Sequence, residues 1–222
     1  MYRHFDGELK TLKEKLLRMS NLVEESISAS VKALIDRNCD LADQVILNDD
    51  AINMMEIEID DLALRLLALH QPQAGDLRFI TSAMKINNDL ERMGDLAVNI
   101  AQLVGDLTKI PAPKSIIHIS QMAQSAQVML RDSLNAFVND DARLAKDVCK
   151  RDDQVDDWNR AIFLEMFEEM SKDRKVIKQD LDLILVARNL ERIADHSTNI
   201  CEDVIYIIEG RVIKHHIEER EQ

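Results

Sequence analysis

Apolar residues recur at steps of three and four along most of the chain, which is the period of an amphipathic helix. The first such stripe consists of Leu9, Leu12, Leu16, Met19, Val23 and Ile27. Later segments repeat the spacing, and proline, glycine or polar residues interrupt it in only a few places. The pattern predicts an all-α protein with six helices of about 24 to 32 residues each.

The interruptions mark the joints between these helices. Pro72 marks one joint and Pro111 marks another near the midpoint, because proline ends a helix. Polar clusters, in which Asp and Asn can cap a following helix, mark the others at residues 36–40, 139–141 and 171–175. Short joints favour antiparallel neighbours, so we expect two tandem three-helix up-down-up bundles, formed by residues 1–110 and residues 111–222.

The chain also contains an internal repeat, which must be recognised early because an overlooked repeat misassigns the fold. Residues 90–95 read LERMGD and residues 190–195 read LERIAD, each followed by an Asn-Ile pair. Residues 41–53 align in the same way with residues 144–156. We therefore expect the two bundles to be related by duplication.

Acidic and amide side chains occupy matched positions in the two copies. The matched rows are Glu91, Asp95 and Asn99 in the first copy and Glu191, Asp195 and Asn199 in the second. Members of a row are four residues apart, so each row lies on one side of its helix. The middle helices carry a second pair, Asp49 with Asn53 and Asp152 with Asp156. An antiparallel bundle can bring each pair beside its row.

Two interpretations of these rows remain open from the residues alone. Like charges four residues apart destabilise a helix by about 0.2 to 0.5 kcal/mol, so they require either solvent or a cation. Carboxylate and amide oxygens suit magnesium, calcium, manganese or iron, whereas structural zinc prefers Cys and His. The rows therefore predict either a duplicated metal site or a solvated acidic face.

Composition excludes several classes of function. A formal net charge of −13 argues against direct binding to nucleic acid, which requires basic residues. Three cysteines without CxxC spacing are typical of free thiols in a reducing compartment. No apolar run approaches the roughly 18 residues of a membrane span, and the first residues do not form a signal peptide. We expect a soluble cytoplasmic protein without membrane insertion.

Catalytic motifs are missing from the sequence. It contains no G-x-S-x-G, P-loop or HExxH motif, and none of the Glu-xx-His pairs that di-iron bundles use. We therefore expect a binding protein and not an enzyme. Periodicity alone would also fit a generic metal-binding helical scaffold or adaptor.

Three motifs resemble those of the PhoU family of phosphate transport regulators. They are the doubled LER(M/I)(G/A)D motif followed by NI, the turn QPQAGDLR at residues 71–78 and the segment NMMEIEID at residues 53–60. The resemblance extends over roughly residues 5–210 in the same order and spacing. It departs from the family pattern at His70, where a basic residue is common, and at Ala194, where glycine is usual.

The resemblance implies a cytoplasmic, often oligomeric negative regulator of phosphate uptake. Such proteins are thought to link the ATPase of a phosphate ABC transporter to a sensor histidine kinase, and a homodimer is expected. Some members hold metal clusters on their E-xxx-D motifs, which leaves the metal open among iron, manganese, magnesium and zinc. Carried over by position, the ligands would be Glu91, Asp95, Asp49 and Asn53, then Glu191, Asp195, Asp152 and Asp156.

Overall fold

Helices are the only regular secondary structure in the described part of the protein. The computed structural model describes residues 2–109 and 116–211, and no strand occurs among them. The elements are α1 (Tyr2–Asp36), α2 (Cys39–His70), α3 (Ala74–Leu107), α4 (Ile116–Asn139), α5 (Ala142–Lys172), the short 3-10 helix η1 (Arg174–Val176) and α6 (Ile177–Glu209). The all-α prediction and its six long helices are confirmed, although α1, α3 and α6 exceed the expected length.

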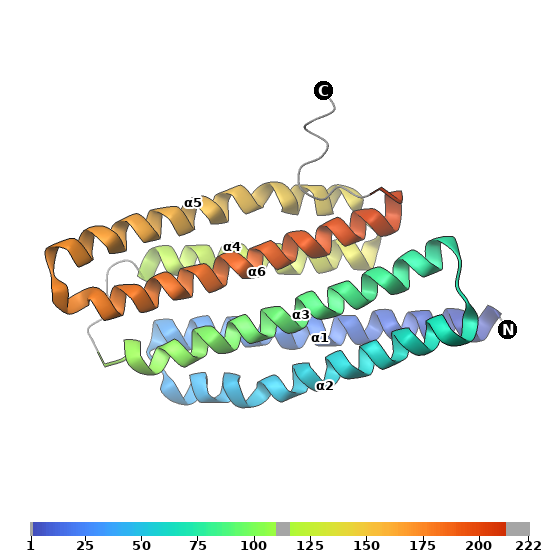
Figure 1. Ribbon diagram of the computed structural model, residues 1–222, viewed down its shortest axis with the longest axis horizontal. Helices are drawn as coiled ribbons and strands as arrows, with labels where there is room; N and C mark the ends of the chain where they lie inside the picture. The colour runs from blue at the N-terminus through green and yellow to red at the C-terminus, as the bar shows by residue number, and fades with distance from the viewer. Residues whose placement is uncertain (1, 110–115, 212–222) are drawn as a thin grey trace, which may run out of the picture.

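The helices form two antiparallel three-helix bundles that lie side by side (Figure 1). Helices α1 to α3 make the first bundle and α4 to α6 make the second, which confirms the predicted duplicated architecture. Helix α3 packs on α6, and α1 packs on α4, so that α2 and α5 lie at opposite edges of the molecule. The predicted boundary between residues 110 and 111 lies outside the described residues. None of the described helices combines the length and apolar character needed to cross a bilayer.

Side-chain caps define several of the joints. The Asn38 side chain accepts a hydrogen bond from the backbone amide of Leu41 at the start of α2. Asp141 caps α5 by accepting from the amides of Arg143 and Leu144. These bonds satisfy amides that have no partner within the helix, which explains why the polar clusters separate helices.

Apolar stripes on the helices merge into a continuous core. Five residues of the predicted first stripe are fully buried: Leu12, Leu16, Met19, Val23 and Ile27. Leu9 packs against this core while partly exposed. Helices α3 and α6 bury residues along their whole length, because each contacts two helices of its own bundle and one helix of the other.

Polar contacts join the two bundles where α3 meets α6. Nδ1 of His196 lies 2.8 Å from Oδ1 of Asp89, and both side chains are almost fully buried. Nearby, the ammonium group of Lys85 donates to Oδ1 of Asp203 at 2.9 Å and lies over the ring of Tyr206. The buried side chains of Asp89, His196 and Asp203 lose solvent, so hydrogen bonds across the interface replace the water that they would otherwise bind.

We predict that Asp89 and His196 are energetically coupled. Asp89→Ala and His196→Ala should each lower the free energy of unfolding by about 1 to 3 kcal/mol, because each removes the hydrogen bond that joins these two buried side chains. The double variant should lower the free energy of unfolding by about 0.5 to 3 kcal/mol less than the sum of the two single effects. Urea denaturation at pH 7 measures all three values.

The exposed pair of Lys10 and Glu14, which are 3.8 Å apart, provides the control. Lys10→Ala should change the free energy of unfolding by no more than about 0.5 kcal/mol, since exposed ion pairs contribute little. Strictly additive effects of Asp89→Ala and His196→Ala would contradict the coupling.

Candidate functional site

Helices α2 and α3 bring together a first acidic cluster, which consists of Asp49, Asn53, Glu56, Glu91 and Asp95. The amide of Asn53 donates to Oδ2 of Asp49 at 2.9 Å. The negative charge of Asp95 acts on both Asp49 and Glu91, and the charge of Glu56 also acts on Glu91. The first four predicted residues therefore converge, as the spacing indicates.

Close packing of α2 on α3 positions this cluster. The Asn87 side chain donates to the backbone carbonyl of Glu56 and to Oδ1 of Asp60, both at 3.0 Å. At Gly94, an added Cβ would lie 3.1 Å from the Ile52 side chain and 3.3 Å from Oδ1 of Asp49. The missing side chain of Gly94 thus lets α2 approach α3 and brings the carboxylate of Asp49 against the α3 backbone.

Helices α5 and α6 form the second acidic cluster from the matched positions Asp152, Asp156, Asn159, Glu191 and Asp195. The charges of Asp195, Asp156 and Glu191 act on Asp152. The Asn159 side chain lies beside Glu191. The four predicted residues of the second copy therefore also converge.

Partial burial and mutual repulsion raise the pKa of several carboxyl groups in the clusters. Burial raises the pKa of Asp152 to about 7, and the charges of Asp195 and Asp156 add to the effect. Burial likewise raises the pKa of Glu191, with further contributions from Asp195 and Asp156. In the first cluster, burial followed by the charge of Asp95 raises the pKa of Glu91.

The donor atoms of both clusters fit a hard cation. All are carboxylate or amide oxygens, which suit magnesium, manganese and iron. Oδ1 of Asp49 is buried and has no hydrogen-bond partner among the described residues, so it could accept a metal ion. As the side chains stand, however, no group of three or more His, Cys, Asp or Glu residues in 2–109 and 116–211 could hold a metal ion. The eight predicted ligands therefore stay a prediction.

The structure differs from the sequence prediction at three residues in or near the acidic clusters. Glu56 and Asn159 occupy aligned positions in the two clusters and were not among the predicted ligands. Their position one helical turn beyond Asn53 and Asp156 is the signal that could have identified them. Asn199 departs from its row, because its amide donates to Oδ1 of Asp89 at the bundle interface, at 3.4 Å.

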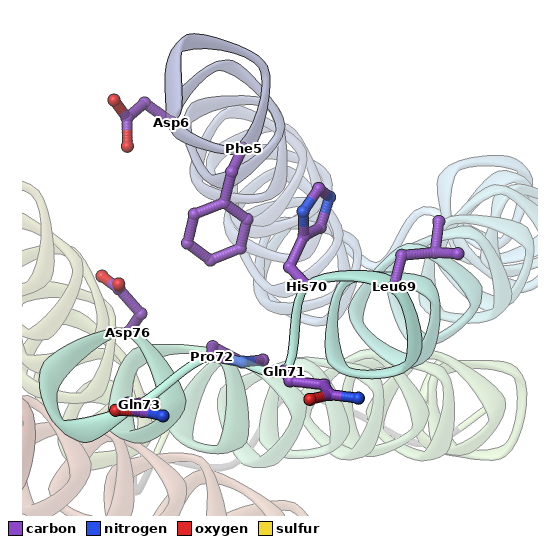
Figure 2. A pocket seen from close by; sticks show the side chains of 8 residues that line it. All are labelled: Phe5, Asp6, Leu69, His70, Gln71, Pro72, Gln73 and Asp76. Atoms are coloured by element: carbon purple, nitrogen blue, oxygen red, sulfur yellow. The ribbon is translucent and has the colours of Figure 1, made fainter. Parts of the chain in front are cut away.

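A separate pocket of about 480 Å³ lies at the turn between α2 and α3. Figure 2 shows the Phe5 ring between His70 on one side and the carboxylates of Asp6 and Asp76 on the other. The His70 ring lies 2.8 Å from Oε2 of Glu8. The histidine that replaces the family's usual basic residue thus pairs with an acidic residue of α1. The pocket is at the end of the first bundle, whereas the acidic clusters lie in the middle of the helices.

Comparison with protein families gives two matches in this chain. The model described as "PhoU domain" matches residues 16–104 and 119–204, one match in each bundle. A PhoU homolog from Aquifex aeolicus is 41% identical over 214 residues, which cover 96% of this chain and 97% of the relative. A PhoU homolog from Pseudomonas aeruginosa is 38% identical over 96% of this chain and 88% of its own length. Both are named phosphate-specific transport system accessory protein PhoU homologs.

Solved structures agree with the observed arrangement. The crystal structure of PhoU from Pseudomonas aeruginosa superposes with a TM-score of 0.91 and 39% identity, covering 93% of this chain and all of that chain. The phosphate transport system regulatory protein PhoU from Streptococcus pneumoniae superposes with a TM-score of 0.87 and 34% identity, over 95% and 99% of the two chains. The fold of the two bundles is therefore shared along nearly the whole chain.

The raised pKa of Asp152 predicts how stability depends on pH. In the unfolded chain this carboxyl group has the ordinary value of 3.8, whereas in the folded protein it holds its proton up to about pH 7. Between these values the folded state binds more protons than the unfolded state, so stability should fall as pH rises. Asp152→Asn should therefore weaken this slope in the metal-free protein. Relative to the native protein, the free energy of unfolding of the variant should be about 1 kcal/mol higher at pH 8 than at pH 5.

Urea denaturation in the presence of a chelator, at pH 5, 6, 7 and 8, measures this slope. Asp157→Asn is the matched control, because the Asp157 side chain is 73% exposed on the same helix. An unchanged slope in Asp152→Asn, or an equal change in Asp157→Asn, would contradict the electrostatic origin of the effect.

Proposed function

This chain belongs to the PhoU family, and from that premise we propose that it represses phosphate uptake and the phosphate-starvation response, the Pho regulon, by protein–protein contact. Its relatives are named accessory proteins of phosphate-specific transport, so its role lies in phosphate transport and is not that of an enzyme. The observation that carries the proposal is the match of the family model to both bundles. The same observation disfavours a helical scaffold unrelated to phosphate.

The proposed partners are the sensor histidine kinase of the phosphate two-component system and the ATPase subunit of the phosphate ABC transporter. The protein would act in the cytoplasm, as a homodimer, by favouring one state of each partner when phosphate is plentiful. Its long rigid bundles support this role, since they offer extended helical surfaces and no catalytic motif.

We further propose that the two acidic clusters bind metal ions. The support is electrostatic: matched carboxylates crowd together in both repeats, and Asp49 keeps an unpaired buried oxygen. A divalent or trivalent cation would offset their repulsion and tie α2 to α3 and α5 to α6. The metal would thus stabilise the bundles that partners recognise.

Metal addition should raise the melting temperature. Manganese at about 100 times its dissociation constant stabilises a folded protein by about 2.7 kcal/mol per site, or roughly 5 to 10 °C for a chain of this size. Differential scanning fluorimetry with manganese, iron, magnesium and zinc measures this shift. It should vanish in a variant with four replacements: Glu91→Ala, Asp95→Ala, Glu191→Ala and Asp195→Ala.

A control variant removes four exposed acids outside the predicted ligands: Asp43→Ala, Asp61→Ala, Asp157→Ala and Glu168→Ala. It reduces the net negative charge by the same four units as the first variant and should keep the full shift. Two results would contradict metal binding: equal shifts of the melting temperature in both variants, or no shift of the native protein with any of the four metals. The clusters would then be a solvated acidic surface.

Deletion of the gene should derepress the phosphate response. In high phosphate, alkaline phosphatase expression should rise by about tenfold, the scale of a coupling free energy near 1.4 kcal/mol. Plasmid-borne native protein should restore repression, as measured by phosphatase activity. Expression that stays fully repressed after deletion would contradict the proposed regulation.

A further inference from the structure

The outer face of α2 carries an apolar stripe that the bundle does not cover. The stripe consists of Leu47, Met54, Ile57 and Leu64, whose exposed fractions are 74%, 58%, 53% and 55%. Their spacing of seven, three and seven residues places them along one side of the helix, as in the seam of a coiled coil. The opposite side of α2 already supplies the core through Val45, Ile52, Ile59 and Leu66.

The internal repeat shows that the bundle does not require this stripe. At the alignment of residues 41–53 with residues 144–156, continued along the helix, α5 carries Lys150, Asp157 and Arg160 where α2 carries Leu47, Met54 and Ile57. Only Leu64 aligns with an apolar residue of α5, Phe167. Since α5 folds into an equivalent bundle with charged residues at three of the four positions, the α2 stripe serves a purpose other than folding.

Charge identifies what could cover the α2 stripe. Helix α2 contains eight acidic residues and one arginine, Arg65. Asp43, Asp50 and Asp61 are exposed and lie on the same side as the stripe. A second copy docked here would bring these acids against their own counterparts, and like charges across an interface weaken it. A partner with basic residues beside an apolar stripe would satisfy both features.

We propose that the outer face of α2 docks an amphipathic helix of another protein, with Leu-like residues at heptad spacing and Lys or Arg along its flanks. Figure 1 shows α2 at the edge of the molecule away from the second bundle, where a partner helix has access. The inference rests on the proposed function, because it assigns the surface through which one regulated protein is engaged. The apolar residues would supply binding energy, and the acids would set partner choice and orientation.

The test uses the full chain and a fluorescent synthetic helix with leucine at heptad positions and lysine on the flanks. A second peptide with the same leucines and with glutamate in place of lysine controls for charge. The basic peptide should bind the native protein, measured by fluorescence anisotropy, at least about tenfold more tightly than the acidic peptide. Absence of binding at about 100 µM, or equal binding of both peptides, would overturn the proposal.

Two variants locate the binding surface. Met54→Lys with Ile57→Lys places two cations in the stripe and should weaken binding of the basic peptide by at least about tenfold. Leu164→Lys with Phe167→Lys adds the same charge on α5, at residues that are 66% and 59% exposed, and should weaken it by less than about twofold. All four substituted residues are exposed, so the substitutions should leave the helices intact, and circular dichroism checks this.

Other outcomes assign the face differently. Equal weakening by both variants would overturn the location on α2. A native dimer in light scattering that dissociates with Met54→Lys and Ile57→Lys would show that a second copy covers the stripe. Peptide binding that behaves as expected, in a protein whose deletion leaves phosphatase repressed, would support this surface and contradict only the proposed regulation.

Discussion

Helices α3 and α6 must each pack against three neighbours at once, and the placement of their own polar side chains depends on this constraint. Each contacts two helices of its own bundle and one of the other, so most of its circumference is apolar. Two places on these helices gather polar side chains. One is the bundle interface, where Asp89 meets His196. The other is the edge that faces α2 or α5, where the carboxylates of the acidic clusters gather.

The acidic clusters are costly because the same packing that positions them also limits their hydration. Gly94 brings α2 close enough to place Asp49 against α3, and in the second bundle the charges of Asp156 and Asp195 act on the partly buried Asp152. Desolvation and repulsion act in the same direction, so the folded protein favours protons or cations at these positions. That preference connects the packing of the helices with the proposed metal binding.

Much of this arrangement follows from the sequence, because helical period and the internal repeat are local properties. Spacing alone predicts that Asp49 and Asp95 meet across α2 and α3, since both helices are long and antiparallel. Spacing could not predict that Asn199 turns toward Asp89, because that contact depends on how one bundle sits on the other. It also could not predict that His70 pairs with Glu8, which lies 62 positions away in the sequence.

The side-chain titration of Asp152 tests the central claim most directly, namely that each cluster is a desolvated group of like charges that favours a cation. Carboxyl carbon chemical shifts measured by NMR in metal-free protein should give Asp152 a pKa of about 7. Added magnesium, which is diamagnetic, should lower that pKa, because a cation stabilises the ionised form. A pKa near the ordinary 3.8, or one that magnesium leaves unchanged, would contradict the account.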